Sequence, residues 1–211
     1  MAQIAAPVTV NLAIKEATMS ETLEKLQARL REVEDQIEAE WDKRRSALNY
    51  HMEQGRAVFS EAATAAHRAA KVQMWLFLRR TKLLVILTAP FIYMCVIPFA
   101  LLDFFVTMYQ MVCFPVYKIA KVKRGDYIVM DRQHLAYLNG IQKLNCLYCG
   151  YGNGVVAYVG EVSARTEKYW CPIKHAQRTK GAHRYYSEFA DYGDAPGFVE
   201  KSPKLRNDLR D

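Results

Sequence analysis

The thirty-five residues from Leu83 to Tyr117 constrain this chain more than any other feature, because they carry a single formal charge, Asp103. A run this long and this apolar is typical of a membrane segment. As a straight helix it would extend about 52 Å, whereas the hydrocarbon core of a bilayer is about 30 Å thick. The sequence therefore predicts a membrane protein with water-soluble flanks, whose apolar segment does not cross the bilayer as one straight helix.

Two arrangements fit the length of this run. In the first, residues 83–102 span the membrane once and residues 103–117 lie along the far interface. In the second, the run is a helical hairpin with its bend between Pro98 and Asp103, so that Asp103 is a solvated turn residue. Both flanks are basic, and the positive-inside rule then favours the hairpin, with both flanks in the cytoplasm. The flanking side chains expected at the membrane surface are Arg79, Arg80, Lys82, Lys118, Lys121, Lys123 and Arg124.

The positive charge of the chain is concentrated just after the apolar run. Residues 118–184 carry twelve basic and four acidic side chains, a balance of +8. Beside a membrane segment such a domain is expected to bind anionic lipid headgroups rather than nucleic acid. The first residues have no basic n-region and no sustained apolar stretch, so we expect no secretory signal. The expected location is the cytoplasmic (inner) membrane, with the soluble parts facing the cytoplasm.

A long helix is predicted before the membrane segment. A capping box at Thr18–Glu21 begins it, and high helix propensity continues to about Arg80. Apolar residues recur at steps of three and four, which is the pattern of a coiled-coil seam: Leu23, Leu26, Leu30, Val33 and Ile37. Only two clean heptads support a coiled coil. We expect an amphipathic helix that binds itself or a partner protein; the alternative is a helix folded back onto this chain's own domain.

Three cysteines and one histidine have the spacing of a metal site. Cys146 and Cys149 form a Cys-x2-Cys pair, and Cys171 and His175 follow as Cys-x3-His. Three thiolates and one imidazole fill all four positions of a tetrahedral zinc ion, so the predicted zinc site is structural. Iron in place of zinc, a Cys146–Cys149 redox pair, and no metal at all remain as alternatives.

Short elements are predicted around these residues. We expect a strand over residues 125–130, a helix capped by Asp131, a second helix over residues 153–168, and a third that begins at Pro172. The fold class is therefore mainly α, with a long coiled-coil helix, a membrane hairpin or single kinked span, and a small α+β metal-binding module. The expected domains are an N-terminal extension (1–18), the long helix (19–80), the membrane segment (83–117), the basic zinc-binding module (118–184) and a polar tail (185–211), which is ordered only if it docks on something.

No Ser–His–Asp triad or paired carboxylates can be argued from the spacing, so no catalytic residue is assigned. The leading hypothesis is a non-enzymatic membrane-anchored scaffold or accessory subunit of a membrane protein complex. An iron- or thiol-based electron-transfer or redox-sensing protein is the second hypothesis. The third is a monotopic enzyme acting on a lipid-linked substrate, with the polar residues nearest the membrane involved: Asp103, Asp126, Asp131 or His134.

Overall fold

A computed structural model describes residues 6–47, 50–53 and 56–210 of the chain. The described part is mainly helical, as predicted. It divides into two compact units, Met1–Ala66 and His67–Asp211.

The N-terminal unit contains one long helix followed by a β-hairpin. Helix α1 (Ala6–Ala47) has 42 residues and is about 63 Å long. Strands β1 (Tyr50–Glu53) and β2 (Arg56–Phe59) pair antiparallel, with the rings of Tyr50 and Phe59 5.2 Å apart. The predicted helix over residues 19–80 is therefore wrong in extent, since it starts earlier and stops at Ala47. Aromatic residues at both ends of the 50–59 stretch, with Gly55 near its centre in the sequence, favour a hairpin over helix propensity.

Short helices connect the hairpin to the apolar run. Helix α2 (Glu61–Ala69) begins after Ser60, whose hydroxyl accepts a hydrogen bond from the Ala63 amide at 3.2 Å. Helix α3 (Met74–Arg80) follows and ends in two arginines.

The apolar run forms one nearly continuous helix and not a hairpin. Helices α4 (Leu83–Met94) and α5 (Val96–Tyr117) meet at Cys95, and together they are long and apolar enough to cross a membrane. The predicted bend between Pro98 and Asp103 is wrong, because α5 continues through both residues. Pro98 lies in the first turn of α5, where a missing amide proton leaves no helical hydrogen bond unmade. The observed segment matches the alternative of a single kinked helix.

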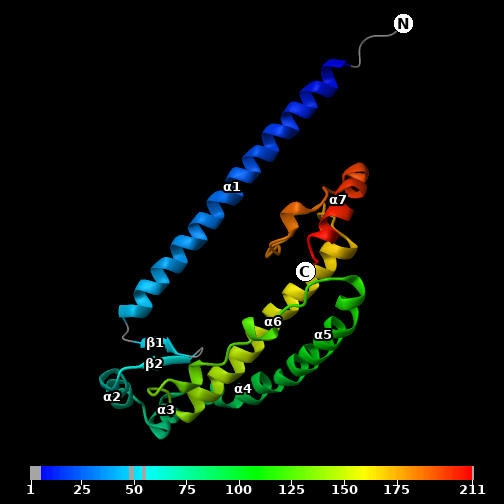
Figure 1. Cartoon of the computed structure of the whole chain (residues 1–211). Helices are drawn as coiled ribbons and strands as arrows, with labels where there is room; N and C mark the ends of the chain where they lie inside the picture. Colours follow the sequence, from blue (N-terminus) through cyan, green and yellow to red (C-terminus); the bar gives the residue numbers. More distant parts are fainter. Residues whose placement is uncertain (1–5, 48–49, 54–55, 211) are drawn as a thin grey trace. The chain divides into compact units, whose positions relative to one another are not determined.

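Helix α6 (Gly140–Trp170) lies alongside α5 and runs parallel to it (Figure 1). The ring of Tyr148 lies 5.7 Å from that of Tyr93, and further along the ring of Tyr169 lies 5.2 Å from that of Tyr117. Two adjacent parallel helices require a connection that runs back along them. Residues 118–139, called the return segment here, make this connection.

The return segment begins at Lys118, whose φ of 59° ends α5 in a left-handed cap. It contains two 3₁₀ turns, η1 (Arg124–Asp126) and η2 (Arg132–His134), where the sequence predicted a strand and an α-helix, so both of those predictions are wrong. Asn139 then caps α6 through a reciprocal pair of 3.0 Å hydrogen bonds with Gln142. The predicted helix over residues 153–168 is confirmed as part of α6.

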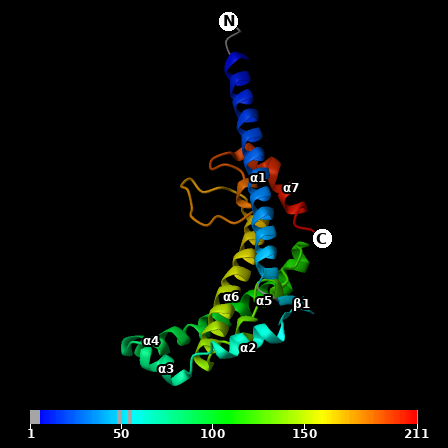
Figure 2. The same ribbon diagram turned by 90° about the vertical axis from the view of Figure 1, so that its left-hand side faces the viewer.

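The end of the chain packs on the C-terminal half of α6. After η3 (Tyr186–Glu188), helix α7 (Ala195–Asn207) lies beside the end of α6 (Figure 2). The Ala120 amide donates to the Leu209 carbonyl at 2.8 Å, which ties the end of the chain to the return segment. The predicted polar tail therefore docks on its own chain. The core of this unit consists of Phe114, Ile119, Val122, Tyr158, Val162 and Leu209.

Candidate functional site

The single charge of the apolar run lies at the centre of a polar network. Asp103 is only 7% exposed and lies within α5. Its carboxylate accepts two hydrogen bonds from Arg124 of the return segment, at 2.9 and 2.6 Å. The Tyr151 hydroxyl of α6 donates a third at 3.0 Å. The prediction of a solvated turn residue is therefore wrong, since one carboxylate joins three segments of the fold.

The Thr107 hydroxyl donates to Asp103 at 3.4 Å, and Gln110, about one helical turn further along α5, continues this network. The Gln110 side chain accepts from the Val122 amide at 2.6 Å and donates to the Val122 carbonyl at 3.2 Å. It also donates to the Tyr158 hydroxyl at 3.0 Å, and that hydroxyl lies 3.3 Å from the Thr107 hydroxyl. The irregular backbone of the return segment thereby obtains partners that a helix or sheet would otherwise supply. We call this set the buried polar network: Asp103, Thr107, Gln110, Arg124, Tyr151 and Tyr158.

Glycines on α6 let the return segment approach the helix closely. A Cβ atom on Gly154 would lie 2.8 Å from both the Ile128 Cα and the Tyr127 carbonyl oxygen. A Cβ atom on Gly152 would lie 2.9 Å from the ring of Phe99. These glycines lie within α6, where Gly154 leaves room for the backbone of the return segment and Gly152 leaves room for α5.

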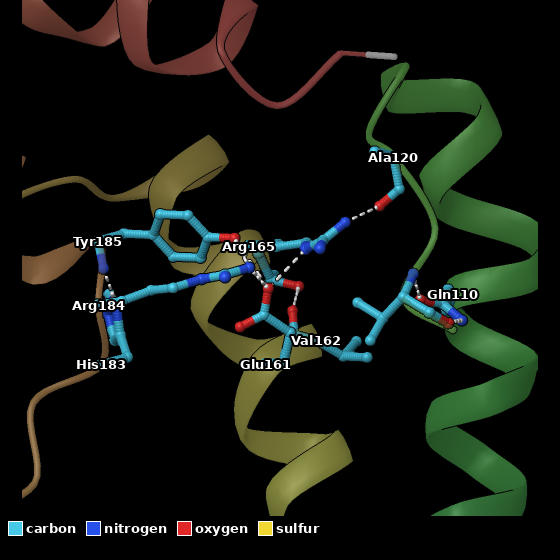
Figure 3. Close-up of polar contacts among 10 residues, drawn as sticks. Gln110, Ala120, Glu161, Val162, Arg165, His183, Arg184 and Tyr185 are labelled. Atoms are coloured by element: carbon cyan, nitrogen blue, oxygen red, sulfur yellow. Dashed lines mark hydrogen bonds and ion pairs between the residues drawn. The ribbon is translucent and has the colours of Figure 1, made fainter. Parts of the chain in front are cut away.

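A second group of polar side chains lies further along α6 (Figure 3). Glu161 accepts hydrogen bonds from Arg165 at 2.9 Å, from Tyr185 at 2.8 Å and from Arg184 at 2.5 Å. Arg165 also donates to the Ala120 carbonyl at 2.5 Å. We call Glu161, Arg165, Arg184 and Tyr185 the ionic cluster. It joins α6 to the return segment on one side and to the C-terminal segment on the other.

The environment of Glu161 favours its charged form. Burial alone raises the pKa of this carboxyl, but the hydrogen bonds from Arg165 and Tyr185 and the charge of Arg184 outweigh burial and leave the pKa lowered. The same burial raises the pKa of Tyr185, and its hydrogen bond to Glu161 adds to that shift. Glu161 is therefore charged and paired with Arg165 and Arg184 at neutral pH.

Lys168 ties the C-terminal segment to the same end of α6. It is 4% exposed, and its ammonium lies 2.7 Å from Glu188, 3.9 Å from Asp208 and 4.9 Å from the centre of the Tyr185 ring. A buried lysine needs such partners, because an unpaired charge there would be costly. His183 contacts Glu167 at 3.0 Å nearby.

A cleft of about 410 Å³ lies between α5 and α6, beside the Glu167–His183 pair. Its wall is mostly apolar, and Glu167 is the one charged residue that lines it. The His183 ring already contacts the Glu167 carboxylate. Among the residues that line the cleft, none therefore offers a charged group without a partner.

The four predicted zinc ligands are not brought together. Cys146 and Cys149 lie inside α6, whereas Cys171 follows its last residue, so Cys149 and Cys171 are separated by about 33 Å along the helix. His175 lies four residues further on, and its backbone amide donates to the Tyr186 hydroxyl at 2.6 Å. Among the described residues, no group of three or more His, Cys, Asp and Glu side chains could hold a metal ion. Zinc or iron binding has no support from this geometry and stays a prediction.

The basic residues expected at the membrane surface lie at the two ends of the α4–α5 helix. Arg79 and Arg80 end α3, Lys82 caps the start of α4, and Lys118 follows α5. Lys121 and Lys123 are exposed on the return segment. Arg124 differs from the others, because its guanidinium is paired with Asp103.

Sequence reasoning missed the partners of Asp103, Gln110 and Glu161. A signal existed for one of them, since a lone carboxylate in an apolar run requires a compensating cation. No protein-family model, curated protein or solved structure matches this chain.

Proposed function

We propose that this chain is a non-enzymatic membrane-anchored scaffold or accessory subunit, held in one face of the bilayer by α4 and α5. The observation that carries the proposal is the exposed apolar surface of this helix. No part of its most apolar eighteen-residue stretch is buried. Large apolar side chains left in water would be strongly unfavourable, so a lipid environment is the natural partner for this surface.

The two halves of the helix expose different surfaces. In α4 no residue is buried, and apolar side chains are exposed on all sides. In α5 a stripe that contains Asp103, Gln110 and Phe114 is buried against α6 and the return segment, while the opposite face exposes large apolar residues. These are Ile97, Leu101, Leu102, Phe104, Phe105, Met108, Met111, Val112 and Val116. Such a one-sided helix suits a bilayer surface, with lipid on one face and protein on the other.

The return segment argues against a complete crossing by α5. It runs back along α5 and α6 with irregular backbone, and Asp126, Asp131 and Arg132 are exposed on it. Irregular backbone and exposed charges are not tolerated in contact with hydrocarbon. If α5 spanned the bilayer, this segment would lie at the same depth. A monotopic arrangement keeps the segment in water and places both flanks on the cytoplasmic side, as the charge distribution favours.

Fractionation and protease accessibility test this proposal on the full chain. We expect the protein in the membrane fraction after a high-pH carbonate wash, which removes peripheral proteins. Sites for a specific protease, inserted at the exposed residues Ser60 and Ser187, should both be cut from the same side of oriented vesicles. Cleavage of the two sites from opposite sides would establish a single span, and release by carbonate would remove the anchor altogether.

A further inference from the structure

The apolar seam of α1 is exposed along its described length. The side chains of Leu26, Leu30, Val33 and Ile37 are 58%, 58%, 43% and 52% exposed. They occupy heptad positions d, a, d and a, so they form one continuous stripe along the helix. Isolated helices gain little stability in water, and an exposed stripe of this kind calls for a partner helix.

Two charged residues beside this stripe form no ion pair with any residue that the structure describes. Arg29 lies at a g position and Glu34 at the following e position, and neither is paired among the residues that the structure describes. The last turns of α1 differ, because Arg45 pairs with Glu38 at 2.8 Å, and Lys43 lies 3.7 Å from Glu40. Residues at e and g positions determine which partner a coiled coil accepts and in which orientation.

The spacing of Arg29 and Glu34 identifies the partner. In a parallel coiled coil, a g residue faces the e residue five positions later on the neighbouring helix, so Arg29 of one copy would face Glu34 of the next. The reciprocal pair forms on the other side of the seam. In an antiparallel pair, g residues face g residues, and the g positions Arg29, Gln36 and Lys43 include no acid. We therefore propose that α1 forms a parallel coiled coil with α1 of a second copy of this chain.

This inference rests on the proposed function in one respect, the membrane anchor. In every copy of the chain, the same number of residues connects α1 to the membrane anchor. Copies whose anchors have the same orientation in the membrane therefore bring their α1 helices together in parallel. Anchoring also confines the copies to a surface, which raises the effective concentration of a seam only two to three heptads long.

Disulfide cross-linking of the full chain in native membranes tests the orientation. Leu26→Cys and Ile37→Cys, made separately, should each give a cross-linked species under mild oxidation, because identical positions meet along a parallel seam. Arg31→Cys, at an exposed b position, and the parent chain with its five native cysteines are the controls. Cross-linking at only one of positions 26 and 37 would indicate an antiparallel pair, and cross-linking at neither would remove the proposal.

Charge reversal tests the recognition step. Arg29→Glu turns both predicted pairs repulsive and should reduce co-isolation of two differently tagged copies by about fivefold. The double variant Arg29→Glu with Glu34→Arg restores opposite charges and should recover co-isolation. Arg31→Glu makes the same charge change outside the seam and should have no effect. An unchanged yield for Arg29→Glu, or no recovery in the double variant, would contradict the proposal. Membrane fractionation tests the membrane anchor separately from the coiled coil. A protein found in the soluble fraction that still forms the cross-links would refute the membrane anchor and leave the coiled coil standing.

Discussion

Substituting two glycines of the same helix tests how the return segment is held on α6. Gly154→Ala and Gly160→Ala make the same chemical change six residues apart. A Cβ atom on Gly160 meets no atom within 4 Å, whereas a Cβ atom on Gly154 lies 2.8 Å from two backbone atoms of the return segment. The two substitutions should therefore change stability in opposite directions.

The magnitudes follow from helix propensity and packing. Alanine is favoured over glycine inside a helix by about 1 kcal/mol, and at Gly160 nothing opposes this gain. At Gly154 the same gain is set against an overpacking cost of about 1–3 kcal/mol, and here the cost lies at the upper end because backbone must move rather than a side chain. The difference between the two variants should be about 2–3 kcal/mol, which corresponds to about 5–10 °C in Tm for a unit of this size.

Thermal unfolding of the detergent-solubilised full chain, followed by tryptophan fluorescence, measures this difference. Gly160→Ala should raise Tm and Gly154→Ala should lower it. Gly152→Ala should lie between them, because its Cβ would meet the ring of Phe99, a half-exposed side chain that can move. If Gly154→Ala is as stable as Gly160→Ala, the return segment does not pack on α6 as described.

Three further changes test the polar groups and the predicted metal. Arg124→Ala leaves the buried carboxylate of Asp103 without its cation and should lower the free energy of unfolding by about 2 kcal/mol. This loss is smaller than that for a fully buried ion pair, because water screens the partly exposed arginine. The pKa of Glu161 is lowered in the folded chain, so the stabilising contribution of its carboxylate is present at neutral pH and is lost as the pH falls below the ordinary carboxyl range. In a series of Tm measurements at decreasing pH, the Tm of Glu161→Gln should therefore fall less steeply than that of the parent chain. Elemental analysis tests the predicted zinc site: about one zinc per chain, lost in Cys149→Ser and kept in Cys95→Ser, would support it and would require α6 to break, because Cys149 and Cys171 lie too far apart along this helix to bind one ion.

Local patterns predicted the helices well and their limits poorly. The seam from Leu26 to Ile37 indicates a helix, because its period of 3.5 residues has no other explanation. The prediction of one helix up to Arg80 also covers residues 50–59. In the structure this stretch forms two strands, because it contains strand-forming residues. Periodicity identifies an element over several turns, whereas an element's end depends on a few residues.

The course of the apolar run could not be predicted from its charges. Basic flanks favour a common side of the membrane, and a bend is only one way to achieve this. The proposed monotopic arrangement is another, because a helix lying in the bilayer surface also keeps both ends on one side. The choice depends on contacts across more than twenty residues, such as Asp103 with Arg124 and Gln110 with Tyr158.

The cysteine pattern illustrates a different difficulty. Cys146 and Cys149 have the spacing of a zinc knuckle, but the same interval of three residues also fits neighbouring positions on one face of a helix. The glycines that follow Cys149, which are Gly150, Gly152 and Gly154, distinguish a zinc knuckle from a helix here. All three lie within α6 and are buried; a Cβ atom on Gly150 or Gly154 would meet the return segment, whereas one on Gly152 would meet the ring of Phe99 in α5. Tertiary contacts with the return segment on one side and with α5 on the other therefore account for these glycines.

The Asp103–Arg124 pair couples the return segment to the apolar helix. An unpaired carboxylate in the centre of a bare apolar helix would be costly in hydrocarbon. Arg124 supplies the charge, but it follows the end of α5 and reaches Asp103 only when the return segment has turned back along the helix. Gln110 must at the same time satisfy the Val122 backbone, which has no other partner in a helix or sheet. In the proposed arrangement, docking of the return segment therefore neutralises the charge of Asp103 and satisfies the Val122 backbone on the protein-facing side of α5, while the opposite, apolar side is left for lipid.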